Sequence, residues 1–191
     1  QVQSKGTLDY HAFLFKFQRR FADNFSLLTS YTLGKSIDLN SDNDGAVTLT
    51  NVYDPQYNRG PSDYDVKHTF SESVIYEIPF GREKVWRGWQ ANAILYLRSG
   101  LPLTITSQNG VQSSGTGNRP DRIGDGAAAD PTITQWFDPT AFVAVTDLTG
   151  TYGDAGRNIL RGPGQFNIDF SVIKNTKIGK LDTEFRVVAF N

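Results

Sequence analysis

Long segments in which apolar and polar side chains strictly alternate are the feature that most constrains this fold. From Trp89 to about Thr106, nearly every odd position is apolar, whereas the even positions include Gln90, Asn92 and Arg98. Successive side chains of a β-strand point to opposite faces of the sheet. The segment therefore predicts one strand with an apolar and a polar face, much longer than the usual ~5–6 residues.

The same alternation recurs in five further segments, at residues 13–18, 25–33, 69–78, 166–172 and 181–191. Together with 89–106 they predict six antiparallel strands. One residue breaks the pattern, because Glu72 stands on the apolar side of its segment. We expect the register to depart from the pattern at Glu72, since a bulge before it would move its side chain to the polar face.

The connections between these strands alternate between short and long. Residues 22–24 form a tight turn, and 79–88 and 175–180 are short, whereas 36–67 and 107–165 are long and rich in Gly, Asp, Asn, Ser and Pro. Short turns at one end of the strands and long loops at the other are the layout of an outer-membrane barrel. Aromatic residues near the strand ends fit interfacial girdles. They are Phe21, Phe25, Phe80, Trp86, Trp89 and Phe166.

We therefore predict an all-β fold, an antiparallel transmembrane β-barrel segment of about six strands with short periplasmic turns and long extracellular loops. The apolar faces would contact outer-membrane lipid. A soluble β-sandwich, whose strands also alternate, remains an alternative. Because about eight strands are the usual minimum for a membrane barrel, we expect residues 1–191 to be part of a longer protein. The polar faces predicted to line the lumen carry Lys16, Arg98, Asp169, Glu184 and Arg186.

Composition and motifs argue against several classes of function. A net charge of -1 gives no basic footprint for nucleic acid, and without cysteine there are no disulfides or thiolate metal sites. The segment Gly34-Lys35-Ser36 lacks the earlier glycine of a phosphate-binding loop, since Thr29 stands there. His11 and His68 lack the spacing of a catalytic triad or a metal site. We predict no enzyme and no cofactor.

Residues 40–45 resemble the beginning of a calcium-binding loop, with oxygen-bearing side chains and a glycine. The twelfth position is Asn51, where such a loop needs a bidentate glutamate. We therefore predict no tight metal site, and weak calcium binding stays open.

The long loops contain aromatic and arginine side chains of the kind that dominate binding surfaces. The same side chains could instead hold the loops together. As candidates for contact with an unknown extracellular ligand we name Tyr53, Tyr57, Arg59, Tyr64, Trp136, Phe137, Tyr152, Arg157 and Arg161.

A series of short motifs, in order along nearly the whole chain, resembles the C-terminal barrel region of Oar-like TonB-dependent outer-membrane receptors. The motifs include Tyr10-His11-Ala12-Phe13, Ser62-Asp63-Tyr64-Asp65, Gly88-Trp89-Gln90, Ser99-Gly100-Leu101-Pro102, Arg119-Pro120-Asp121, Gln135-Trp136-Phe137-Asp138, Gly156-Arg157-Asn158 and Arg161-Gly162-Pro163-Gly164.

This resemblance implies a receptor in a Gram-negative type of outer membrane, with energy-coupled transport of an unidentified substrate. It also implies a partner, TonB, contacted through a plug region that would precede Gln1. Two alternatives remain open at this point. One is a passive structural or adhesion barrel, and the other is a soluble β-sandwich that binds carbohydrate through loop aromatics.

Overall fold

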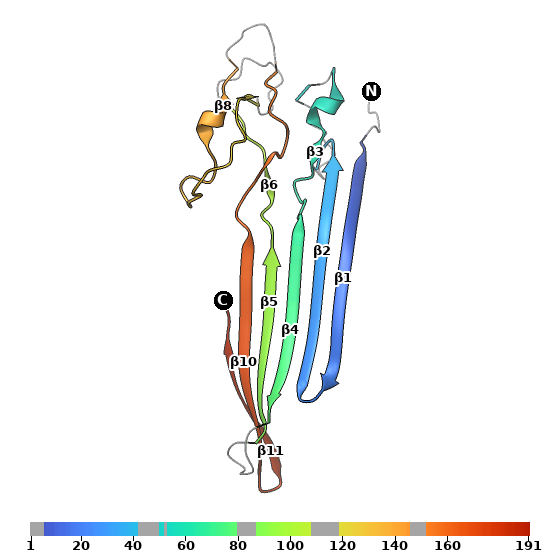
Figure 1. Cartoon of the computed structure of the whole chain (residues 1–191), viewed down its shortest axis with the longest axis vertical. Helices are drawn as coiled ribbons and strands as arrows, with labels where there is room; N and C mark the ends of the chain where they lie inside the picture. Colours follow the sequence, from blue (N-terminus) through green and yellow to red (C-terminus); the bar gives the residue numbers. More distant parts are fainter. Residues whose placement is uncertain (1–5, 42–49, 52, 80–86, 108–118, 146–151) are drawn as a thin grey trace. The chain divides into compact units, whose positions relative to one another are not determined.

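The computed structural model describes residues 6–41, 50–51, 53–79, 87–107, 119–145 and 152–191. Its main sheet contains six long strands in the order β1-β2-β4-β5-β10-β11 (Figure 1). This confirms the predicted all-β class and the six strands. In the described part of the chain, no helix is long and apolar enough to cross a membrane. The long strands are β1 (Leu8–Ala22), β2 (Phe25–Asp38), β4 (His68–Ile78), β5 (Trp89–Arg98), β10 (Gln165–Ile178) and β11 (Leu181–Ala189).

The long loops contain short elements of their own. The strand β3 pairs with the end of β2, β6 pairs with β9, and β7 pairs with β8. Two 3-10 turns begin at prolines that follow an aspartate, whose side chain accepts a backbone N–H of the turn. These elements are η1 (Pro55–Asn58), β3 (Gly60–Pro61), β6 (Pro102–Leu103), β7 (Asp121–Arg122), η2 (Pro139–Ala141), β8 (Phe142–Val143) and β9 (Leu160–Arg161).

The chain divides into two compact units. We call the first the loop unit; it comprises the described residues of 1–11, 34–66 and 99–164. The second is the strand unit, which comprises those of 12–33, 67–98 and 165–191. Each unit is built from segments far apart in sequence, so each depends on long-range contacts.

In the strand unit, the cross-strand register brings the predicted apolar positions into one continuous face. Residues directly opposite each other on paired strands share a face. Phe70 lies opposite both Tyr31 and Leu97, and Leu97 lies opposite Phe166. Rows nearer the turns contain Leu27, Val74, Ala93 and Phe170, then Phe25, Tyr76, Ala91 and Val172, then Ile78, Trp89, Lys174 and Phe185.

The departure of the register expected at Glu72 does not occur, and no bulge precedes this residue in β4. The pairing of β4 with β2 and with β5 runs without interruption through Ser71, Glu72 and Ser73. Glu72 therefore stays on the apolar face, between Thr29 and Leu95. The prediction was wrong because two regular neighbouring ladders fix the register of β4, and one charged side chain does not break them.

The strand predicted for residues 89–106 ends earlier, at Arg98. The second residue after the strand is Gly100. An added Cβ there would lie 1.8 Å from the carbonyl oxygen of Gly162, so only glycine fits. Pro102 then begins the short β6. Alternation misled the prediction here, because Leu101 and Leu103 continue the apolar pattern, although Leu101 lies outside the strands and Leu103 belongs to a different sheet.

The turn predicted at 175–180 is shorter than expected. Strand β10 continues to Ile178, and only Gly179 and Lys180 connect it to β11. Gly179 has a φ of 67°, the left-handed conformation that tight hairpins require. The predicted turn between β1 and β2 is confirmed, because Asp23 and Asn24 both have positive φ. Phe80, Trp86 and most of the calcium-like loop lie outside the described residues.

Candidate functional site

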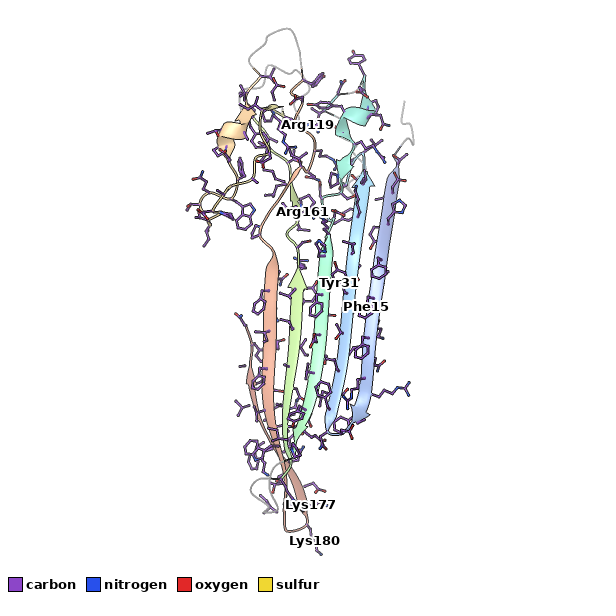
Figure 2. The ribbon with its side chains drawn as sticks, in the orientation of Figure 1. Phe15, Tyr31, Arg119, Arg161, Lys177 and Lys180 are labelled. Carbon is purple, nitrogen blue, oxygen red and sulfur yellow. The ribbon has the colours of Figure 1, made fainter. Side chains whose placement is uncertain are left out.

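The apolar face of the strand unit consists of large side chains that remain accessible. Phe15, Phe17, Phe166 and Phe170 each keep between 45% and 58% of their surface exposed. Arg19 of β1 lies beside this face, with its guanidinium carbon 5.4 Å from the centroid of the Phe25 ring. An apolar surface of this extent suits an apolar solvent. Figure 2 labels Phe15 and Tyr31 on two of these strands.

Aromatic side chains bound this face toward both ends of the strands. On the turn side, Lys174 lies opposite Trp89, with its Nζ 5.4 Å from the indole centroid. Farther along, the Tyr31 hydroxyl hydrogen-bonds His68 Nδ1 at 2.8 Å. From Trp89 to Leu97 the strand rises ~27 Å, which is roughly 20 Å along the membrane normal at a ~40° tilt. That span is close to the ~25 Å apolar band of outer-membrane barrels.

The opposite face of the strand unit is mixed and carries connected polar side chains. Gln90 Nε2 donates to Asn92 Oδ1 at 2.6 Å, and Asn92 Nδ2 donates to Ser171 Oγ at 3.1 Å. Asn167 Nδ2 donates to Asp169 Oδ1 at 3.2 Å. The register also places Arg98, Glu184 and Arg186 on this face, as predicted.

A sheet with one apolar face between aromatic rows, and hydrogen-bonded polar groups on the other face, meets the needs of a membrane-spanning barrel wall. A family model described as an outer membrane beta barrel domain matches residues 1–191. The chain belongs to this outer membrane β-barrel family. Membership locates the protein in the outer membrane and removes the soluble β-sandwich alternative. Searches of curated proteins and of solved structures found no match.

In this β-barrel domain, the loop unit is held together by a buried ion pair between Arg157 and Asp38. The Asp38 side chain is only 2% exposed. Arg157 Nη2 donates to the Asp38 carboxylate and, at 3.1 Å, to its main-chain oxygen. Arg157 Nε donates to the Asn58 carbonyl at 3.0 Å. One guanidinium thus links the end of β2 to the turn η1.

A second pair joins Arg161, which is labelled in Figure 2, to the buried carboxylate of Asp65. Arg161 Nη2 donates to the carboxylate, and Nη1 donates to the main-chain oxygens of Asp65 at 2.9 Å and Gly100 at 3.2 Å. The other carboxylate oxygen of Asp65 accepts the backbone N–H of Ser36 at 2.6 Å. The charge of Arg161 is therefore already balanced within the loop unit.

Arg119 is a third arginine of the loop unit, and our sequence reasoning did not single it out as a site residue. It is 3% exposed, and its guanidinium carbon lies 3.7 Å from the centroid of the Tyr57 ring. Arg119 Nη2 donates to the Tyr57 carbonyl at 2.6 Å, while Nε and Nη1 are buried with no partner among the described residues. The Tyr57 hydroxyl donates to the Gly153 carbonyl, and the Tyr57 and Tyr152 rings are 5.4 Å apart. The only sequence signal was the motif Arg119-Pro120-Asp121.

Trp136 and Phe137 lie beside a small pocket in the loop unit. The pocket has a volume of about 210 Å³. Trp136 Nε1 donates to the Arg161 carbonyl at 2.6 Å, which fixes the indole against β9. The Phe137 ring packs edge-on against Phe142 at 6.1 Å. The lining residues are Gly126, Ala127, Ala128, Pro131, Trp136, Phe137, Leu160 and Arg161.

The remaining predicted ligand contacts lie at the surface. Tyr53 is 98% exposed and Tyr64 is 55% exposed. Arg59 forms an accessible ion pair with Asp9 at 2.8 Å. The nine candidates thus divide into residues bonded within the loop unit and a smaller accessible group, and ligand contact by any of them stays a prediction.

The acidic segment at 40–45 is described only as far as Ser41, whose hydroxyl donates to Asp38 Oδ2 at 2.7 Å. Among the described residues, no group of three or more His, Cys, Asp or Glu side chains could hold a metal ion. Elsewhere in the loop unit, hydrogen bonds from the Thr140 hydroxyl and backbone N–H lower the pKa of the Asp138 carboxyl below 3.8. Asp138 is thereby held as the charged cap of η2.

A larger hollow of about 900 Å³ lies beside the β10–β11 hairpin of the strand unit. Its lining carries charges of both signs, and Lys177 pairs there with Asp182 at 3.4 Å. Figure 2 labels Lys177 and Lys180 in this hairpin. Because opposite charges already face each other, this hollow favours no particular class of ligand.

Proposed function

We propose that this chain is part of the barrel of a TonB-dependent receptor that takes part in energy-coupled transport of an unidentified substrate. The observation that carries the proposal is the loop unit itself. Two buried arginine–aspartate pairs join segments that the sequence keeps far apart. Loops fixed in this way form a preorganised surface, which lowers the entropy lost when a ligand docks. The motif series that resembles Oar-like receptors gives independent support.

The polar face of the strand unit supports the same proposal. Side chains such as Asn92, Asn167 and Asp169 can form further hydrogen bonds. In a receptor of this class they would contact a plug that fills the lumen. A barrel that only spans the membrane needs no such contact.

The two edges of the sheet bear on the domain organisation. Among the described residues, the pairing path ends at β1 and at β11. An edge left open in lipid exposes backbone N–H and C=O groups, each costing several kcal/mol. We therefore include in the proposal that further strands of a longer protein pair with both edges and that a plug region precedes them.

A passive structural or adhesion barrel is the second candidate. It is favoured by the fact that Tyr57, Trp136, Arg157 and Arg161 are already bonded within the loop unit. Such bonds would equally stabilise a surface that adheres without transporting. Dependence on TonB separates the two functions.

The test compares cells that lack this protein with cells that lack TonB, across a panel of nutrient sources. We expect every growth defect of the first strain to recur in the second. Full-length protein should restore growth, whereas the same protein without its TonB-contacting segment should reach the outer membrane and fail to restore growth. Full restoration by that truncated protein would overturn the transport proposal in favour of the passive barrel.

A further inference from the structure

The pocket beside Trp136 has a fixed shape. The loop that runs from Gly126 to Asp138 supplies most of the lining, and its two ends are joined because the Asp138 N–H donates to the Gly126 carbonyl at 3.0 Å. Ala127 and Phe137 form an isolated antiparallel bridge next to that bond. The indole of Trp136 is held by its hydrogen bond to the Arg161 carbonyl. These contacts keep the pocket open without a ligand.

The lining of the pocket is largely apolar, and its two polar side chains, Trp136 and Arg161, are already hydrogen-bonded. Side chains of Ala127, Ala128, Pro131 and Leu160 line it together with the two aromatic rings. Among the described lining residues, Arg161 contributes the one charged side chain, and its guanidinium is bonded to Asp65 and to the Gly100 carbonyl. A carbohydrate would lose hydrogen bonds to water here without replacement. An anionic ligand would meet a charge that Asp65 has already neutralised.

We infer that this pocket binds one neutral apolar ring, the size of an aromatic side chain. A volume of about 210 Å³ accommodates a single ring with its linking methylene. The indole face gives such a ring an edge-to-face or offset-stacked partner. Ile133, which is fully exposed, lies between Pro131 and Trp136 in sequence and adds apolar surface to the same loop. The further claim that this ring belongs to the transported substrate rests on the proposed receptor function.

The test uses the full-length protein in detergent with ¹⁵N-labelled tryptophan. The indole N–H signal of Trp136 is assigned by its loss in Trp136→Phe. Titration with N-acetyl-phenylalaninamide should shift this signal saturably, with a Kd in the millimolar range expected of a fragment-sized ligand. N-acetyl-glycinamide, which has no side chain, and methyl glucoside, a sugar, should leave the signal unchanged.

Two matched variants locate the binding. Ala128→Leu places a larger side chain in the pocket and should weaken binding at least about tenfold, because it takes up the volume that the ring would occupy. Ala129→Leu adds the same side chain at the neighbouring exposed position outside the lining and should bind normally. The inference is overturned by the absence of a saturable shift in the unmodified protein, by saturation with methyl glucoside instead, or by equal binding in both variants. Because the measurement requires neither TonB nor uptake, its failure is distinguishable from failure of the transport proposal.

Discussion

Glu72 of β4 lies directly opposite Leu95 of β5, so a carboxylate shares the lipid-facing surface with a leucine. On its other side, β2 contributes Thr29 at the same level. The row lies between the aromatic row of Tyr31 and the row of Leu27. Since both ladders are regular there, the backbone has no local freedom to turn Glu72 away from lipid.

Replacing Glu72 by leucine should stabilise the folded barrel. An ionisable group in the apolar band costs free energy, although less for an acid than the ~2–4 kcal/mol of a midplane Arg or Lys. We expect Glu72→Leu to raise the free energy of unfolding by about 1 kcal/mol, measured by urea unfolding of the full-length protein in lipid vesicles. Glu77→Leu, which lies on the opposite face, is the control and should give no gain. A loss of stability in Glu72→Leu would show that a partner covers this carboxylate.

Spin labels should distinguish the two faces of the strand unit. Labels at Leu95 and Phe170 belong to the apolar face and should be accessible to oxygen in a bilayer. Labels at Asn92 and Asp169 belong to the opposite face and should not be. Power-saturation measurements on the full-length protein would report this difference. The reverse pattern would contradict the assignment of the apolar face to lipid.

Breaking the Arg157–Asp38 pair should loosen the loop unit and leave the strands intact. Removing one partner of a buried ion pair costs about 3–5 kcal/mol. In Asp38→Asn we therefore expect amide exchange to accelerate more than about 100-fold at Ser62, whose backbone N–H donates to the Ser36 carbonyl at 3.0 Å. Arg59→Lys alters an exposed pair and should change exchange little, since such pairs contribute about 0–1 kcal/mol. Equal effects in the two variants would contradict a structural role for the buried pair.

The capping of η2 by Asp138 should depend on pH in a defined direction. Because the folded-state pKa lies below the ordinary 3.8, the capping interaction is present above that value and is lost as the pH falls through the folded pKa. Thr140→Val removes the hydroxyl donor and should raise the Asp138 pKa toward 3.8. Carbon-detected NMR titration of the carboxyl group would measure both values. An unchanged pKa in the variant would show that the backbone N–H of Thr140 alone sets it.

The sequence by itself determined the wall of the barrel. A period of two is a local property of the strand, so alternation located all six long strands and assigned their faces without knowledge of their partners. The turn at Asp23 and Asn24 could also be predicted from the sequence, because the residues that favour a turn lie next to one another in the chain. Local signals failed to predict where a strand ends when that end depends on contact with a segment distant in sequence. Strand β5 ends at Arg98 because Gly100 must fit against Gly162, which lies at the far end of the same long connection.

Only the tertiary structure decided what the loop residues do. Arginine and aromatic side chains are suited to ligands and to internal packing alike, and the choice depends on partners distant in sequence. Arg157 finds Asp38 across 119 positions, and Arg161 finds Asp65 across 96. The motif around Arg119 gave no sign of its contact with Tyr57, since Tyr57 comes from another loop. No pattern along the chain encodes such pairs, because charge and ring contacts form wherever folding brings complementary groups together in a buried environment.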